Sequence, residues 1–298
     1  MAKHALAAEV SIIIPCRNEG ENIKMTVDSI LASTPGRGPE IIVVDDGSSD
    51  GCCRFLQQSN NYERVKLISS SGLGAARARN LGAASARGKY LIFCDAHITV
   101  PQNWLEALLD TFSRPGVDAV SPAIGSLENP AAVGYGQTWN SRLETVWLSP
   151  PGGMPAGPVP LLPGGCLAVR AGAFRRVGGF DEGFIVWGCE DAELSLKLWL
   201  FGCRLYVVPS VRVLHLFRSR HPYPVTMDHV HHNLLRMALS HFKSSRVKKV
   251  MGLIEPCGRL ADTVRRVLQG GALQQRRRYL AGRIYDDDWF MKKFGIEF

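Results

Sequence analysis

Several features that would place this chain in a special class are missing from its sequence. No apolar run approaches the ~18–20 residues that a bilayer-spanning helix needs. The apolar stretch that ends at Pro15 is too short for a signal peptide and predicts a strand. The eight cysteines are scattered, with Cys52 and Cys53 adjacent and no C-x-x-C spacing, which argues against a disulfide scaffold and a zinc knuckle. No internal repeat occurs. We therefore expect a globular protein of the reducing cytoplasm.

Positive charge is in excess only toward the C-terminus. The net charge is +8, yet residues 1–242 hold 22 Lys and Arg against 21 Asp and Glu, whereas residues 243–298 hold 13 against 6. Such a tail can bind an anionic membrane surface or nucleic acid, and a solvated helical face explains it equally well. Because only the tail favours nucleic acid, we expect no nucleic-acid partner. A peripheral contact with the inner face of the membrane stays open.

Strand and helix signals alternate along the first part of the chain, as in a parallel α/β sheet. The expected strands cover residues 9–15, 40–46, 65–70, 90–95 and 117–124, with helices after the first, third and fourth. Residues 125–165 interrupt the pattern; their segment 149–165 is dense in Pro and Gly and predicts a long loop. Further on we expect a helix over Cys189–Gly202, two short strands over 203–217, and helices from 227 onward. The predicted organisation is a catalytic domain over 1–224 and a basic helical extension over 225–298.

Polar residues cluster at three strand ends, which is where ligands of such sheets bind. These ends are residues 15–18, Asp45–Asp46 and Asp95–His97. Asp95 and His97 point the same way on an extended chain. A carboxylate beside an imidazole suits a divalent ion such as Mn²⁺, or Mg²⁺, although a simple strand-end cap has the same appearance.

Other candidates have an ordinary structural explanation beside the functional one. His215 alternates with Val211 and Val213 and is either a core histidine or a third metal ligand. Asp45 and Asp46 are costly to bury as a pair without partners, which a turn explains for only one of them. Glu190 and Asp191 begin a helix, either as acids that the helix dipole favours or as a general base. The set Arg218, His221 and Tyr223 suits either a phosphate site or a basic surface loop.

Taken together, these motifs resemble family 2 glycosyltransferases over roughly residues 9–224. The segments that carry this resemblance are "VSIIIPCRNE", "IIVVDDGSSD", "YLIFCDAH", "GGFDE" and "WGCEDAELSLKLW". A closer likeness runs to the polypeptide N-acetylgalactosaminyltransferases, through "FCDAH", "WGCED" and "VVPSVRVLHLFRSRHPY". The resemblance implies a nucleotide-sugar-binding α/β fold of the GT-A type, a UDP-sugar donor and a bound Mn²⁺.

The resemblance also implies roles for individual residues. Asp95, His97 and His215 would ligate the metal, and Arg218, His221 and Tyr223 would line the diphosphate site. Pro15, Arg17 and Glu19 would neighbour the nucleoside, and Asp46 would hold the uracil with Arg79 nearby. Trp187 would pack against sugar or acceptor, and loop 149–165 would close over the donor.

One position departs from the closer relatives. They retain anomeric configuration and carry Asn after the helix Glu, whereas Asp191 stands here, as in inverting family 2 and galactosyltransferase-like enzymes. We therefore expect transfer with inversion, with Asp191 as a base of ordinary pKa beside Glu190. The lectin domain of the peptide-modifying enzymes is not seen in the sequence, so a peptide acceptor is not implied.

Three alternatives stay open from sequence: a retaining N-acetylgalactosaminyltransferase-like enzyme, a non-catalytic nucleotide-sugar-binding protein, and a nucleotidylyltransferase. A nucleotidylyltransferase would carry a Gly-rich, basic loop after the first strand, and this sequence has none there. The segment "SGLGAAR" also lacks the third Gly of a dinucleotide fingerprint. The acceptor, whether glycan, lipid-linked, peptide or small molecule, is left undetermined.

Overall fold

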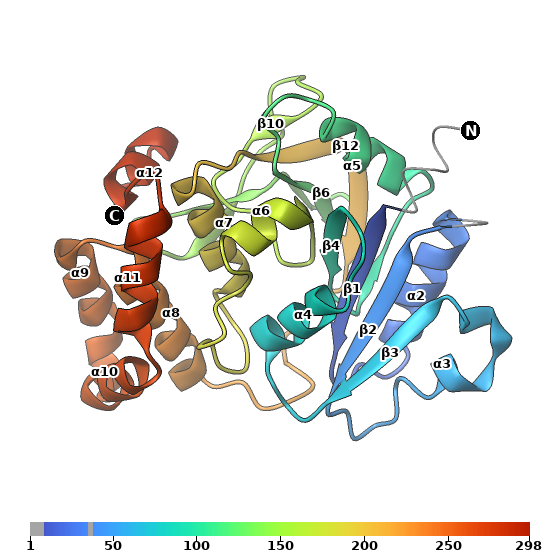
Figure 1. Cartoon of the computed structure of the whole chain (residues 1–298), viewed down its shortest axis with the longest axis horizontal. Helices are drawn as coiled ribbons and strands as arrows, with labels where there is room; N and C mark the ends of the chain where they lie inside the picture. The colour runs from blue at the N-terminus through green and yellow to red at the C-terminus, as the bar shows by residue number, and fades with distance from the viewer. Residues whose placement is uncertain (1–8, 35–37) are drawn as a thin grey trace.

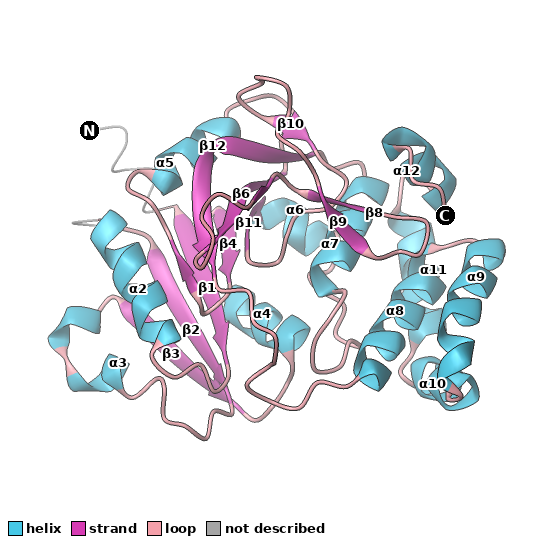
Figure 2. Ribbon diagram, turned by 180° about the vertical axis from the view of Figure 1, so that it is seen from behind, coloured by secondary structure: helices cyan, strands magenta, loops and turns pink. Residues whose placement is uncertain are grey.

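A twisted mixed sheet organises the chain (Figures 1 and 2). The computed structural model describes residues 9–34 and 38–298. Eight strands follow one another in the order β10-β12-β6-β11-β4-β1-β2-β3, with β5 paired to β12 and β7 to β6. Their bounds are β1 Val10–Cys16, β2 Glu40–Asp46, β3 Val65–Ser70, β4 Tyr90–Cys94, β5 Ile98–Thr99, β6 Ala119–Ser126, β7 Val133–Gly134, β10 Gly157–Pro158, β11 Cys166–Arg170 and β12 Leu205–His215.

The N-terminal half of the sheet is parallel, as predicted. β4, β1, β2 and β3 lie side by side, and β1 is buried along nearly its whole length. Helix α2 (Asn22–Ser33) covers one face and α4 (Ala75–Ala84) the other (Figures 1 and 2). α4 packs closely because it is rich in small residues: a Cβ at Gly82 would lie 2.4 Å from a methyl of Ile13. The remaining elements here are α3 Phe55–Gln58, η1 Asn60–Tyr62 and α5 Trp104–Thr111.

Two predictions about the second half are wrong in detail. Residues 203–217 contain one long strand, β12, because the ladder with β6 shifts register between Val208 and Arg212 and then continues. The shift surrounds Pro209, which has no N–H to donate to a neighbouring strand. The segment 149–165 is not all loop, because β10 joins the main sheet. The stretch before it, for which no element was predicted, contains β7, which also joins the main sheet, and β8 (Gln137–Trp139) and β9 (Thr145–Trp147), which form a separate hairpin.

The C-terminal helices pack on α7 (Glu190–Leu200), at the left of Figure 1. One hydrophobic cluster includes Phe93 of the sheet, Leu196 of α7 and Phe290 near the C-terminus. The boundary at residue 224 stays a prediction. The helices are α6 Ala171–Arg176, α8 Met227–His241, α9 Ser244–Ile254, η2 Glu255–Cys257, α10 Leu260–Gln269, α11 Ala272–Gly282 and α12 Asp287–Phe294.

The predicted α/β class with a helical C-terminal region is confirmed. Among the described residues, no helix combines the length and apolar character needed to cross a bilayer.

Candidate active site

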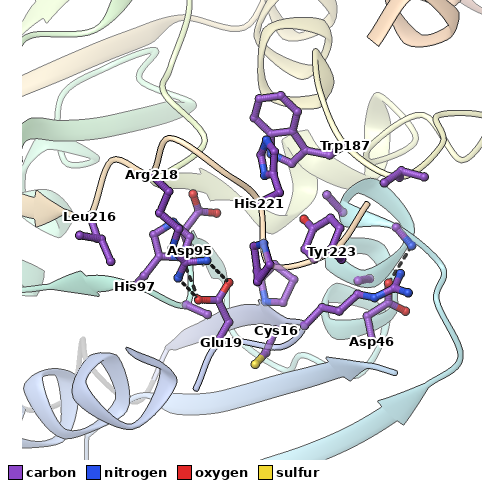
Figure 3. Close-up of a pocket in the computed structure, with 18 of the residues that line it drawn as sticks. Cys16, Glu19, Asp46, Asp95, His97, Trp187, Leu216, Arg218, His221 and Tyr223 are labelled. Atoms are coloured by element: carbon purple, nitrogen blue, oxygen red, sulfur yellow. Dashed lines mark hydrogen bonds and ion pairs between the residues drawn. The ribbon is translucent and has the colours of Figure 1, made fainter. Parts of the chain in front are cut away.

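A cavity of about 320 Å³ opens beyond the carboxyl ends of β1 and β4 (Figure 3). It gathers segments that are far apart in sequence, from β1, β4, α4 and the stretch after β12. The residues predicted to surround the donor nucleotide sugar all line it, namely Pro15, Arg17, Glu19, Asp46, Arg79, Asp95, Trp187, Arg218, His221 and Tyr223. Their individual roles stay predictions.

Asp95, His97 and His215 meet at the floor of this cavity. Their ligand atoms all lie within 4.8 Å of one another. The Nε2 atom of His215 is 3.2 Å from Oδ2 of Asp95, and the two imidazole centroids are 4.7 Å apart. On its other side His97 contacts a carboxylate oxygen of Glu19 through Nδ1 at 3.2 Å. Glu19 therefore orients the ring, as carboxylates that contact the far nitrogen of a histidine do in metalloproteins.

This donor set fits a divalent cation of intermediate hardness. One carboxylate and two imidazoles suit Mn²⁺, and three protein ligands leave coordination positions for a diphosphate. Because Nδ1 of His97 already faces Glu19, its Nε2 is the nitrogen left for an ion. The residues present thus fit the metal that the sequence predicts.

Arg79 lies at the centre of the acidic groups. Its guanidinium donates to Asp95 at 2.8 Å through Nη2 and to Glu190 at 3.0 Å through Nη1, and the residue is only 4% exposed. Burial opposes ionisation of Asp95, but the bond to His215 and the charges of Arg79 and His97 outweigh it, so the pKa of Asp95 is lowered. Sequence reasoning placed Arg79 near the uracil and missed this bridging position, which no local pattern indicates.

Asp46 is already satisfied by the protein. Its carboxylate accepts backbone N–H groups of Leu73 at 2.6 Å and Gly74 at 2.8 Å, and the hydroxyl of Ser70 at 2.7 Å. These bonds shape the 70–74 turn that leads into α4. Only Asp46 of the adjacent pair is buried, and these donors support its burial; a base edge would have to share them. Asp45 is half-buried and accepts the Ser48 N–H at 2.9 Å.

The segment after β12 forms one wall of the cavity. Arg218 donates both terminal nitrogens to Glu19, at 3.2 Å for the longer contact. His221 lies against Trp187 with ring centroids 4.4 Å apart, and Arg17 lies over Tyr223. Figure 3 shows Arg218 beside Asp95 and His97, with Trp187, His221 and Tyr223 farther along the same cavity.

A second cavity, of about 630 Å³, adjoins the first. The two share Arg79, Asp95, Trp187, His215 and Phe217. Beyond the shared residues it is strongly aromatic, with Trp139 and Trp147 from the β8–β9 hairpin. The sequence did not predict this wall, since no element was assigned to the residues between 125 and 149.

Asp191 faces the second cavity from the first turn of α7. Its carboxylate accepts the N–H of Gly164 and its own helix's Ala192 N–H, both at 2.8 Å. Burial raises its pKa to about 6, and the charge of neighbouring Glu190 adds to the effect, against the two backbone donors. The expectation of an ordinary pKa is therefore wrong. Glu190 itself is buried against Arg79 and accepts the Gly188 N–H at 2.8 Å.

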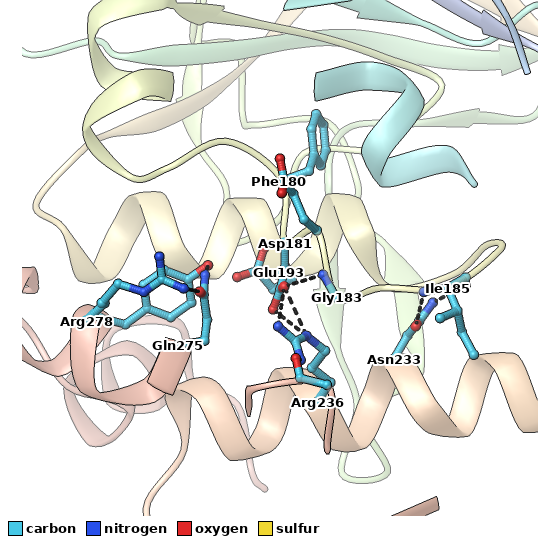
Figure 4. Close-up of polar contacts among 12 residues, drawn as sticks. Phe180, Asp181, Gly183, Ile185, Glu193, Asn233, Arg236, Gln275 and Arg278 are labelled. Carbon is cyan, nitrogen blue, oxygen red and sulfur yellow. Dashed lines mark hydrogen bonds and ion pairs between the residues drawn. The ribbon is translucent and has the colours of Figure 1, made fainter. Parts of the chain in front are cut away.

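The loop before α7 is held in an unusual conformation by α8 (Figure 4). Val186 and Cys189 have φ of 50° and 67°, which is costly for residues with a side chain. Asn233 donates Nδ2 to the carbonyls of Ile185 and Gly188, each at 2.9 Å, and accepts the Ile185 N–H at 2.9 Å. This contact positions Trp187 and the start of α7, and sequence reasoning missed it.

Comparison with known proteins gives the family of this chain. Residues 11–178 match the model of glycosyl transferase family 2, and residues 155–222 match that described as the N-terminal domain of galactosyltransferase. The chain belongs to glycosyl transferase family 2.

Two curated relatives illustrate the likeness. Polypeptide N-acetylgalactosaminyltransferase 11 of Xenopus tropicalis is 34% identical over 252 residues, which cover 76% of this chain and 42% of the relative. Probable N-acetylgalactosaminyltransferase 8 of Caenorhabditis elegans is 28% identical, over 79% of this chain and 62% of the relative. The chain thus spans about half the length of these relatives.

Solved structures agree on the fold. A crystal structure described as GalNAc-T7 with UDP, GalNAc and Mn²⁺ superposes with a TM-score of 0.73 at 21% identity, covering 97% of this chain and 57% of that chain. The mannosyltransferase PcManGT from Pyrobaculum calidifontis, in complex with GDP-Man and Mn²⁺, gives 0.55 at 20% identity, over 92% and 74%. The predicted GT-A fold and family are confirmed.

Proposed function

We propose that this protein transfers a sugar from a UDP-sugar to an acceptor hydroxyl, with Mn²⁺ bound and with inversion at the anomeric carbon. The observation that carries the proposal is the convergence of Asp95, His97 and His215 beside Arg218, with Asp191 in the adjoining cavity. The relatives' names and the UDP and Mn²⁺ in the GalNAc-T7 structure support the UDP-sugar and Mn²⁺ parts of the proposal. The inversion rests on Asp191.

The first cavity suits the donor. The side of this cavity near Pro15 and Arg17 would receive the nucleoside. The side with Asp95, His97 and His215 would bind the diphosphate through the metal. A bound Mn²⁺ would stabilise the negative charge that grows on the diphosphate as it leaves. Arg218 would assist by exchanging its present partner Glu19 for a phosphate oxygen.

The second cavity suits the acceptor. The acceptor oxygen attacks the anomeric carbon and forms the new C–O bond, while the bond to the diphosphate oxygen breaks and its electron pair leaves with UDP. Asp191 takes the hydroxyl proton, and its raised pKa brings it closer to the operating pH of a general base. Trp187 borders both cavities and would pack against the sugar between them.

A retaining reaction is the second candidate, because the relatives are named N-acetylgalactosaminyltransferases.

The experiment that tests the proposal incubates a panel of UDP-sugars with Mn²⁺, first without acceptor and then with glycan, Ser/Thr-peptide and lipid-linked acceptors. We expect Mn²⁺-dependent release of UDP for one donor, and opposite anomeric configurations of donor and product by NMR. Equal configurations would replace inversion by retention. Absence of donor binding across the panel would overturn the enzymatic proposal.

A further inference from the structure

A cluster of three thiols lies beneath the donor cavity. Cys16 ends β1, and Cys52 and Cys53 follow β2 in the next turn. The Sγ atom of Cys16 is 3.5 Å from that of Cys52 and 3.7 Å from that of Cys53, and the latter two are 4.0 Å apart. All three are free thiols. Cys16 and Cys53 are 2% and 4% exposed, whereas Cys52 is half-buried, so solvent reaches the cluster from one side.

The spacing of the sulfurs suits a shared metal ion. Zn²⁺ binds thiolate at about 2.3 Å in tetrahedral geometry, which places two thiolates of one site about 3.8 Å apart. The three measured separations bracket this value. A disulfide would use two of the sulfurs and leave the third without a partner, so the near-equal triangle favours a metal over a redox pair.

We propose that Cys16, Cys52 and Cys53 form a trithiolate site for Zn²⁺, separate from the Asp95–His97–His215 site. Soft sulfur ligands select Zn²⁺ over Mn²⁺, whereas the mixed oxygen and nitrogen set suits Mn²⁺, so the two sites take different ions. Binding releases the thiol protons to solvent. The fourth coordination position of the Zn²⁺ would lie on the side of half-buried Cys52. Water or the Ser48 hydroxyl, which is 3.5 Å from the Cys52 sulfur, could occupy it.

The site would fasten the segment after β1, which lines the first cavity, to the turn after β2. Hydrogen bonds already join them: Asn18 N–H donates to Ser48 Oγ at 3.0 Å, Ser49 N–H to Asn18 Oδ1 at 2.7 Å, and Gly20 N–H to Asp50 Oδ2 at 2.9 Å. Cys16 itself borders the cavity, although its sulfur points away from the other labelled residues in Figure 3. A metal here would therefore be structural, holding Pro15 and Arg17 in place beside the nucleoside position. This inference does not depend on the proposed transfer reaction.

The test uses the full chain, reduced and freed of metal by chelation, and titrated with Co²⁺ as a spectroscopic probe and then with Zn²⁺. We expect one equivalent of Co²⁺ to give sulfur-to-cobalt charge-transfer absorption and intense tetrahedral ligand-field bands, both displaced by Zn²⁺. Cys52→Ser, at the half-buried position, and Cys16→Ser should weaken binding about tenfold or more. Zn²⁺ should raise the midpoint of thermal unfolding in the unmodified chain and in Cys257→Ser, an exposed thiol outside the cluster.

Two further measurements keep the outcomes distinct. His215→Ala should keep the charge-transfer bands, because its site supplies no sulfur. The proposal is overturned if no charge-transfer band appears, or if the bands survive in both Cys16→Ser and Cys52→Ser. It is also overturned if mild oxidation removes two of the cluster's thiols while the reduced chain binds no Zn²⁺, which would make the cluster a redox pair.

Discussion

The imidazole of His215 lies 3.2 Å from the carboxylate of Asp95, although 120 residues separate them in the chain. Strand pairing causes this proximity: β12 runs antiparallel to β5 with His215 opposite Ile98, next to His97. A core histidine on β12 would have pointed into apolar packing. His215 instead ends the strand at the edge of the sheet, where its side chain is 13% exposed and lines both cavities.

The first prediction concerns this residue. His215→Ala removes one of the three proposed metal donors, so the Mn²⁺ concentration for half-maximal activity should rise about tenfold or more. His229→Ala, on the first turn of α8 and outside both cavities, serves as the control and should leave the requirement unchanged. For both variants, the Mn²⁺ requirement is measured by titrating the metal and following transfer activity and the relaxation effect of bound Mn²⁺. An unchanged requirement in His215→Ala would remove His215 from the metal site.

Asp191→Asn tests the base. The substitution keeps the side-chain shape but cannot accept a proton, so transfer should fall by roughly 10²–10⁴-fold. Affinity for UDP with Mn²⁺, measured by calorimetry, should change little because Asp191 lines the second cavity and not the first. Loss of UDP binding together with activity would argue against the assignment.

The pH profile gives an independent check. Asp191 acts as a base only when ionised, and its pKa is raised to about 6 by burial and by Glu190. The rate should therefore be high above pH 6 and decline as the pH falls through about 6. Measurement of kcat against pH, with metal saturating at each point, shows the acid limb. An acid limb near pH 4 would indicate that Asp191 titrates like an exposed carboxyl.

Local sequence patterns predicted the parallel half of the fold because its strands are continuous β-branched runs that end in polar residues. Pairings between distant segments were harder. Only the family resemblance predicted His215 as a metal ligand, since its own alternation with Val211 and Val213 fits a core strand equally well. The thiol cluster escaped notice because Cys16 and Cys52 are 36 residues apart and meet only when β1 and β2 pair. Asn233 was missed because it supports the loop before α7 from a different helix.

Arg79→Met tests the central ion pairs. The guanidinium is buried and contacts both Asp95 and Glu190, so its removal leaves two carboxylates without their partner. We expect the free energy of unfolding to fall by about 3–5 kcal/mol, as for other broken buried pairs. Urea denaturation measures it. Arg87→Met, whose side chain is 86% exposed and pairs with Glu40, should cost less than about 1 kcal/mol. Equal effects of the two substitutions would show that the buried bridge contributes little.

Asn233→Ala tests whether α8 positions the loop before α7. The side chain makes bonds to Ile185 and Gly188 and is 1% exposed, so its truncation leaves buried backbone groups without partners. Each such group costs about 1–3 kcal/mol, and the positive φ angles of Val186 and Cys189 should relax once it is gone. That loop positions Trp187 and the start of α7, so kcat should fall in Asn233→Ala while the Mn²⁺ requirement stays constant. The control Asn129→Ala, on an exposed turn, should change neither quantity. A purely structural role would lower stability with kcat per folded molecule intact, which steady-state kinetics below the unfolding transition would reveal.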